Sequence, residues 1–213
     1  MSRNMRYEER FDRIPASAAI RSKQRGLAIA FVFYSPKNKL KMTVNGIPAY
    51  CHLLLCEGNP LISAFRPLTI NESGSNRVRQ AADVFYKNGE TETWAFSWAE
   101  PKSGAIRFLD GTSIVRWRCA QELQGKSVLI NNWIRLTAFM SAARGLCTTQ
   151  ERALIRYHLD HHGCATIGSL INLGGVDCGL MLSEVAAELA SGAISCDLAS
   201  RELKKSTMLT RPS

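Results

Sequence analysis

A β-hairpin predicted between residues 82 and 98 constrains the fold of this chain more than any other segment. Residues 82–86 read as a strand, and residues 93–98 alternate between polar and apolar side chains as a second strand. Asn88-Gly89 lies between them and is the dipeptide most typical of a tight hairpin turn, because both residues tolerate positive φ angles. The first strand of this hairpin carries one carboxylate, Asp83.

The hairpin also carries the residue types of half a metal-dependent nuclease site. Asp83 lies on the first strand, and Glu100 and Lys102 follow the second. Cleaving a phosphodiester needs a hard cation held by oxygens and a lysine that orients water or stabilises charge. The sequence therefore predicts Asp83, Glu100 and Lys102 as catalytic residues and Asp83 as a Mg²⁺ ligand. A hairpin carboxylate with a structural role is the alternative, and Pro101 places Glu100 and Lys102 in a turn beyond the strand.

The other half of such a site is missing. No carboxylate lies between Asp12 and Glu57. A site built on Asp83 alone, or with Glu100, would hold Mg²⁺ weakly. An acid from elsewhere in the chain, such as Glu57, would have to complete it.

The charge of the chain favours a polyanionic partner. The 213 residues carry a net charge of +9, and residues 1–45 hold ten Lys or Arg against three acids. Nucleic acid is the first candidate and an acidic membrane surface the second. A solvated basic tail is the plain alternative. The expected DNA-binding residues are Arg21, Lys23, Arg25, Lys37, Lys39, Lys41, Arg77 and Arg79.

Cysteine usage indicates a reducing compartment. The seven cysteines are odd in number and include no C-x-x-C pair, which argues against a disulfide framework and a zinc ribbon. Free, mostly buried thiols in the cytoplasm are expected. The chain does not open like a signal peptide, and its longest apolar run, residues 27–34, is too short to span a membrane. We therefore expect a cytoplasmic protein without a membrane partner.

Residues 27–146 read as an α/β region with a mixed sheet. Strands are expected over 27–34, 40–44, 61–70, 82–86, 93–98, 106–109 and 114–119, and a helix over 132–143. Residues 49–56 fit either a short helix or a buried strand. Residues 1–26 form a basic N-terminal arm.

Residues 147–213 read as a helical unit. Thr148 through Glu151 has the pattern of a capping box ahead of a helix that ends at Gly163. Further helices are expected over 165–173 and 180–191, and a short strand within 192–198; together they resemble a winged-helix arrangement. His158, His161, His162 and Cys164 have residue types that bind zinc, but histidines in a last helical turn also complement the helix dipole.

Several segments, taken in order, resemble TnsA-type proteins, the endonuclease subunits of Tn-seven-like heteromeric transposases. The segments are the Ser35-Pro-Lys-Asn-Lys39 turn, residues 44–55, residues 60–67, the Asp83 hairpin, residues 189–198 and Thr207-Met-Leu209. The resemblance covers roughly residues 30–210. It implies a restriction-endonuclease-like fold that nicks the 5′ ends of a transposon beside a DDE-type transposase. It also implies that an AAA+ regulator binds the C-terminal region, and that the protein joins the bacterial nucleoid when bound to DNA.

The departures from the family pattern concern its catalytic positions. Asp83 matches the family's metal-binding Asp, but residues 46–50 hold no acid where the family has a catalytic Glu. Arg66-Pro67 stands in place of Gln-Pro. The acid-x-Lys position falls on Glu100 and Lys102, or on residues 96–98, which have neither residue type. The resemblance therefore implies a DNA-transposition protein that binds transposon ends and partner proteins with its nuclease lost or reduced.

Two alternatives remain open. One is an active Mg²⁺-dependent endonuclease that nicks transposon 5′ ends. The other is a winged-helix transcriptional regulator, although residues 180–191, the expected recognition helix, contain no Lys or Arg.

Overall fold

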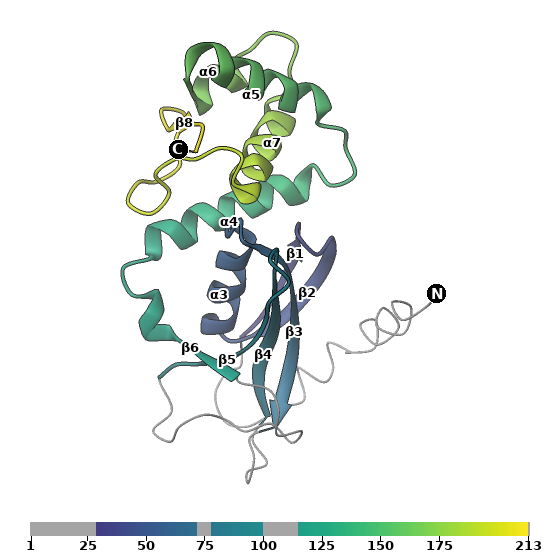
Figure 1. The fold of residues 1–213 in the computed structure, drawn as a ribbon, viewed down its shortest axis with the longest axis vertical. Coiled ribbons are helices and arrows are strands. Elements are labelled where there is room, and N and C mark those ends of the chain that lie inside the picture. The colour runs from purple at the N-terminus through teal and green to yellow at the C-terminus, as the bar shows by residue number, and fades with distance from the viewer. Residues whose placement is uncertain (1–28, 72–77, 100–114, 213) are drawn as a thin grey trace.

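The structure, a computed structural model, describes residues 29–71, 78–99 and 115–212, and within these ranges it shows an α/β protein with a mixed sheet (Figure 1). The strands come mainly first and the helices mainly last. In chain order the elements are β1 (Ala30–Ser35), β2 (Leu40–Asn45), α3 (Ile47–Glu57), β3 (Ile62–Asn71), β4 (Val78–Tyr86), β5 (Thr91–Ser97), β6 (Val115–Cys119), the 3₁₀ turn η1 (Ala120–Leu123), α4 (Ser127–Ala142), α5 (Thr149–His162), β7 (Cys164–Thr166), α6 (Ile167–Ile171), α7 (Cys178–Ser191) and β8 (Met208–Thr210).

The predicted hairpin is confirmed as the centre of a four-stranded sheet. The strand order is β3-β4-β5-β6, with β3, β4 and β5 antiparallel and β6 parallel to β5. Gly89 in the β4–β5 turn has a φ of 89°, which a residue without a Cβ adopts at little cost. Strands β1 and β2 form a separate antiparallel hairpin. Pro67 lies in β3, an edge strand of this sheet, where its missing N–H costs least.

Residues 49–56, which the sequence left open between helix and strand, form most of helix α3. The helix is apolar on opposite sides because it is covered on both. Leu53 and Cys56 pack in the core over the sheet, whereas Leu54 packs with Trp133 of α4 in the helical core. When a short segment is apolar on every side, its hydrophobic periodicity cannot distinguish a helix from a strand.

Both faces of the central strands are buried. Ala82, Val84, Trp94 and Phe96 face α3, whereas the alternating residues Ala81 and Ala95 belong to a smaller cluster with Ile70 and Val115 on the opposite face. We refer to these as the α3 face and the Asp83 face of the sheet, because Asp83 shares the side of Ala81.

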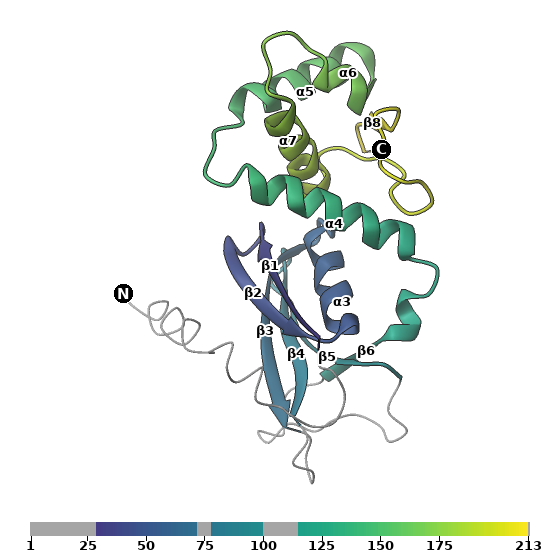
Figure 2. The same cartoon turned by 180° about the vertical axis from the view of Figure 1, so that it is seen from behind.

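Helix α4 lies across the end of α3, between the sheet and the C-terminal helices (Figures 1 and 2). Trp133 of α4 sits directly over Gly58, the residue that ends α3; a Cβ on Gly58 would lie 2.0 Å from the indole ring. The helix begins at Ser127, five residues before the predicted start, and its apolar side belongs to the same core as α5 and α7. The domain boundary expected at residue 146 stays a prediction. The strand expected over 106–109 lies outside the described residues.

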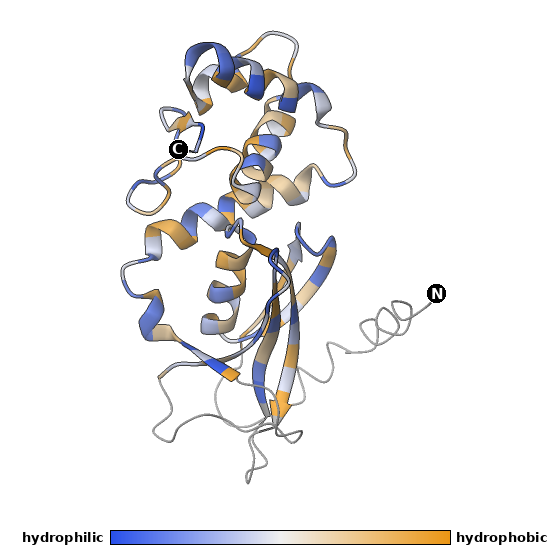
Figure 3. Ribbon diagram, in the orientation of Figure 1, coloured by the Kyte–Doolittle hydropathy of each residue, from blue (hydrophilic) through white to orange (hydrophobic). Residues whose placement is uncertain are grey.

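The C-terminal helices pack around α7. Helix α7 is largely apolar and mostly buried, whereas α5 is more hydrophilic (Figure 3). Asp177 caps α7 by accepting a hydrogen bond from the Leu180 N–H at 2.9 Å. Strand β8 pairs with β7 on one side and bridges to Ser195 on the other. The strand expected within residues 192–198 is reduced to this single bridge.

The predicted capping box before α5 is wrong. Thr148 is the N-cap residue, but its hydroxyl donates to the Glu184 carboxylate of α7 at 2.6 Å instead of accepting from the helix backbone. Glu184 also accepts from Arg152 Nε at 2.5 Å, and Glu188, one turn later, contacts Arg152 at 3.3 Å and Arg156 at 3.5 Å. This ion-pair ladder fastens α5 to α7.

The structure also bears on the expected buried cysteines, the histidine cluster and the absence of a membrane span. All seven cysteines are free, but only Cys51, Cys56 and Cys119 are buried. His161 Nδ1 lies 2.9 Å from the Tyr157 carbonyl oxygen. No group of three potential metal ligands, histidines included, occurs among the described residues. Within the described ranges, no helix combines the length and the apolar character needed to cross a membrane.

The close contact between Gly58 and Trp133 predicts a steric cost for Gly58→Ala. The φ of Gly58 is −86°, which alanine adopts freely, so the cost comes only from displacing the indole. We expect a loss of about 1–3 kcal/mol in unfolding free energy, measured by urea denaturation. Gly174→Ala, at a position with nothing within 4 Å of the added Cβ, is the matched control and should be close to neutral. A Gly58→Ala protein as stable as the control would contradict the contact.

The ion-pair ladder predicts that Arg152→Ala destabilises the helical unit. The substitution leaves the buried Glu184 and Glu188 carboxylates without the guanidinium that both contact. We expect a loss of about 3 kcal/mol in urea denaturation. Arg201→Ala removes an arginine whose side chain is 84% exposed and should cost under about 0.5 kcal/mol. Equal losses in the two variants would show that the ladder is not a special contact.

Candidate functional site

Asp83 is the centre of a polar row that crosses three strands. It stands directly opposite Arg66 of β3 and Thr93 of β5. One carboxylate oxygen, Oδ2, lies 3.0 Å from a guanidinium nitrogen of Arg66, and the other, Oδ1, accepts a hydrogen bond from the Thr93 hydroxyl at 2.9 Å. Both oxygens of the predicted metal ligand therefore have partners from neighbouring strands.

Asp83 is also the one acid on its face of the described strands. Glu92 is the other acid within β3–β6, and strand alternation places it on the α3 face. There it accepts from the Tyr86 hydroxyl at 2.9 Å and from Trp94 Nε1 at 2.7 Å. The Asp83 face instead carries two guanidinium groups, those of Arg66 and Arg79, and the Arg79 group lies 5.2 Å from the ring centre of Trp117.

The described residues therefore do not fit the Mg²⁺ ion that the family resemblance implies at Asp83. Mg²⁺ takes six oxygen ligands and is usually held through one or two carboxylates. The described part of this face offers one carboxylate, already paired with Arg66, and one threonine hydroxyl. Glu100 and Lys102, the other two predicted catalytic residues, lie outside the described residues.

Glu57 forms a second polar cluster, at the end of α3. Its buried carboxylate accepts hydrogen bonds from the Ser35 hydroxyl and from the Lys37 N–H, the latter at 3.1 Å. The Ser35 oxygen in turn accepts from the Asn38 side chain at 2.7 Å, and Asn38 Oδ1 accepts from the Phe65 N–H at 3.1 Å. The β1–β2 turn is thus clamped to α3 and to β3.

Lys37 adds further contacts between the β1–β2 turn and the segment that follows α3. Its ammonium group donates to the carbonyl oxygens of Asn59 and Ile62, the second at 2.7 Å. Burial lowers the pKa of Lys37 to about 8, against the opposing effect of Glu57. Burial raises the pKa of Glu57 to about 7, although the hydrogen bonds from Ser35 and Lys37 and the charge of Lys37 act in the other direction.

The structure does not bring Glu57 and Asp83 into one site. Glu57 ends the helix that covers the α3 face, whereas Asp83 points to the opposite face, and each carboxylate has its own set of partners. Glu57 therefore cannot serve as the acid that completes a metal site at Asp83.

The predicted DNA-binding residues are found in different surroundings. Lys39, in the β1–β2 turn, and Lys41, on β2, are exposed. Lys37 is engaged with backbone carbonyls, and Arg79 lies against Trp117. Arg21, Lys23, Arg25 and Arg77 lie outside the described residues.

Sequence patterns do not single out two partners of Asp83 as site residues. Arg66 stands out only as a departure from the family pattern, and no pattern marks Thr93. A signal was present in β3, where Arg66 alternates with the apolar Leu68 and Ile70, a position that favours a buried or paired charge.

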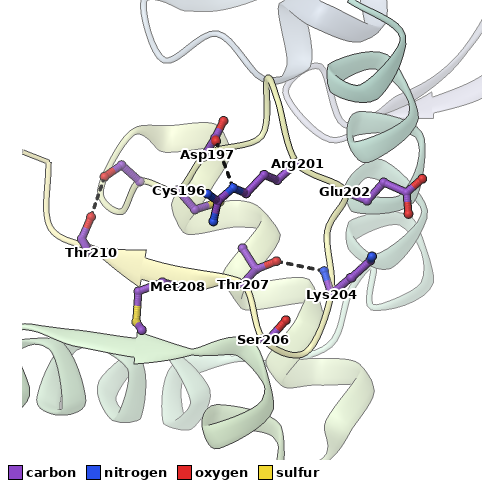
Figure 4. A pocket seen from close by; sticks show the side chains of 10 residues that line it. Cys196, Asp197, Arg201, Glu202, Lys204, Ser206, Thr207, Met208 and Thr210 are labelled. Atoms are coloured by element: carbon purple, nitrogen blue, oxygen red, sulfur yellow. Dashed lines mark hydrogen bonds and ion pairs between the residues drawn. The ribbon is translucent and has the colours of Figure 1, made fainter.

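A hollow of about 800 Å³ lies in the C-terminal unit between the turn after Ser195 and β8 (Figure 4). Arg201 and Lys204 line it together with Asp197 and Glu202, so its two basic side chains are matched by two acidic ones. Asp197 lies 3.8 Å from the Arg201 guanidinium. The hollow therefore shows no preference for an anion.

The comparisons with known proteins leave the family open. No model of a known protein family matches the chain, and no curated protein matches it either.

The raised pKa of Glu57 predicts a pH-dependent stability. Because the folded protein holds the Glu57 proton more tightly than the unfolded chain, with its ordinary pKa of 4.5, stability falls as the pH rises from about 5 to about 7. Glu57→Gln should remove this fall, which is on the order of 2–3 kcal/mol. Urea denaturation across this pH range measures it.

The exposed Glu90 provides the matched control for that experiment. Glu90→Gln removes the same charge from a solvated position and should leave the pH dependence of the wild type in place. An unchanged slope in Glu57→Gln would contradict the assignment to Glu57.

Proposed function

We propose that this chain is a TnsA-like DNA-transposition protein that binds DNA and partner proteins and whose nuclease is lost or much reduced. The observation that carries the proposal is the state of Asp83: the residue that matches the family's metal ligand is the one acid on its face of the described strands, and Arg66 and Thr93 use its oxygens. A DDE-type transposase and an AAA+ regulator are the proposed protein partners.

The order of elements supports the fold that the resemblance implies. A helix, α3, covers one face of a mixed sheet whose central hairpin holds Asp83, as expected for a restriction-endonuclease-like domain. In the C-terminal unit the order is α5, β7, α6, α7, the Ser195 bridge and β8, with β8 pairing to both β7 and Ser195. This order is compatible with a winged-helix-like domain, which we include in the proposal.

Electrostatics supports DNA as the main partner. The net charge of +9 attracts a polyanion, and Lys39 and Lys41 are exposed beside the clamped β1–β2 turn. Lys37 is left out of the proposed DNA contacts because its ammonium already donates to two carbonyl oxygens.

The winged-helix regulator is the weaker alternative. A recognition helix needs an exposed face that enters the major groove. Helix α7 is mostly buried, and its two glutamates face α5, where they contact Arg152 and Arg156.

A nicking assay tests the proposed loss of nuclease activity. The full chain is incubated with a transposon-end duplex, Mg²⁺ or Mn²⁺ and the partner transposase, and nicks are compared between wild type and Asp83→Asn. We expect binding without Asp83-dependent nicks. Nicks at the 5′ ends that disappear in Asp83→Asn would identify an active endonuclease and overturn this part of the proposal.

Salt dependence tests the DNA contacts. Affinity for a labelled duplex, measured by fluorescence anisotropy, should fall roughly a thousandfold between about 50 and 200 mM salt. Lys39→Asn with Lys41→Gln should weaken binding and lower the salt slope by about one per lysine that contacts a phosphate; Asn suits position 39, where φ is 56°. Lys126→Gln, at the start of α4, is a control for general charge loss. A flat salt response would contradict phosphate-based binding.

Gene neighbourhood tests the transposition part independently. A DDE-type transposase gene and an AAA+ ATPase gene beside this one are expected, and their absence would argue against it.

A further inference from the structure

We infer that the guanidinium of Arg66 occupies the position beside Asp83 that a divalent metal ion would occupy. We infer also that this guanidinium keeps Asp83 from binding a metal ion. The inference concerns the site of the proposed function and rests on that proposal for its meaning in DNA transposition. Its chemistry is independent of DNA, because it concerns only how the charge of Asp83 is neutralised.

The strand register builds the pair into the sheet. Arg66 stands directly opposite Asp83 across β3 and β4, and the two side chains meet at 3.0 Å. They are 31% and 18% exposed, so the pair is partly withdrawn from water, where a charge–charge contact is screened less. The planar guanidinium presents its donors in a fork that matches a carboxylate, which suits it to this position opposite Asp83.

The second oxygen of Asp83 is also occupied. Thr93 is fixed opposite Asp83 on β5, and its hydroxyl donates to Oδ1 at 2.9 Å. A metal ion at Asp83 would have to displace the guanidinium of Arg66, compete with the Thr93 hydroxyl, and find its other ligands in water. The entering ion has no second carboxylate on the described part of this face to compensate for these losses.

The surrounding charge acts in the same direction. The Asp83 face of the described strands carries the guanidinium groups of Arg66 and Arg79, and Asp83 is the one carboxylate on it. A divalent cation that approached Asp83 would be repelled by the Arg66 guanidinium, which lies 3.0 Å from Oδ2. A role for the carboxylate follows: Asp83 compensates the charge of Arg66 within the sheet.

Metal binding to the full chain, without DNA, tests this inference. Mn²⁺ is the probe, and free Mn²⁺ is followed by electron paramagnetic resonance at constant ionic strength for wild type, Asp83→Asn, Arg66→Gln and the Arg66→Gln/Asp83→Asn double variant. Wild type and Asp83→Asn should give the same titration. Arg66→Gln should gain a site at least about tenfold tighter than any in wild type, equivalent to 1.4 kcal/mol, and the double variant should lose it.

Arg66→Lys is the matched control, because it keeps the positive charge but not the planar guanidinium. It should exclude Mn²⁺ as wild type does, which separates the effect of charge from the effect of packing. If Arg66→Gln does not fold, as judged by circular dichroism, a Mn²⁺ site in wild type that is lost in Asp83→Asn would still overturn the inference.

Two results would overturn the inference. One is a Mn²⁺ site in wild type that disappears in Asp83→Asn, because the metal would then coexist with Arg66. The other is a folded Arg66→Gln protein that gains no Mn²⁺ site. Neither result depends on whether the protein binds DNA, so a failure here is distinguishable from a failure of the proposed function.

Discussion

A carboxylate held in the middle of a β-sheet must be neutralised or hydrogen-bonded, and the pairing of Asp83 with Arg66 and Thr93 meets this constraint here. The row joins β3, β4 and β5 at one level of the sheet. It also decides what the sheet can do chemically, because an oxygen that accepts from a guanidinium is a poor ligand for a second cation. The proposed function and the role assigned to Arg66 both depend on this one row.

The two acids Asp83 and Glu57 serve different faces of the sheet region. Asp83 balances Arg66 on one face, whereas Glu57 holds the β1–β2 turn against the end of α3 on the other. One residue beyond Glu57, Gly58 receives the indole of Trp133, so the same end of α3 anchors both the hairpin and α4. The exposed lysines Lys39 and Lys41 therefore lie on a hairpin that is held in place by its contacts with the end of α3.

Sequence patterns predicted the elements whose signals are local. The β4–β5 hairpin followed from Asn88-Gly89, and the end of α5 followed from Gly163, which adopts a left-handed φ of 73°. The contacts that define the site are not local: Arg66 is 17 residues from Asp83, and Ser35 is 22 residues from Glu57. Hydrophobic periodicity along the sequence does not predict contacts between residues this far apart. The capping box failed for the same reason, because Thr148 found a stronger partner in Glu184, 36 residues away.

The exclusion of metal from Asp83 is tested most directly by a crystal structure of the full chain grown with Mn²⁺, with an anomalous difference map calculated at the manganese edge. We expect no manganese peak within coordination distance of Asp83 and a guanidinium of Arg66 in contact with Oδ2. A manganese ion bound to Asp83, with Arg66 turned away, would contradict it.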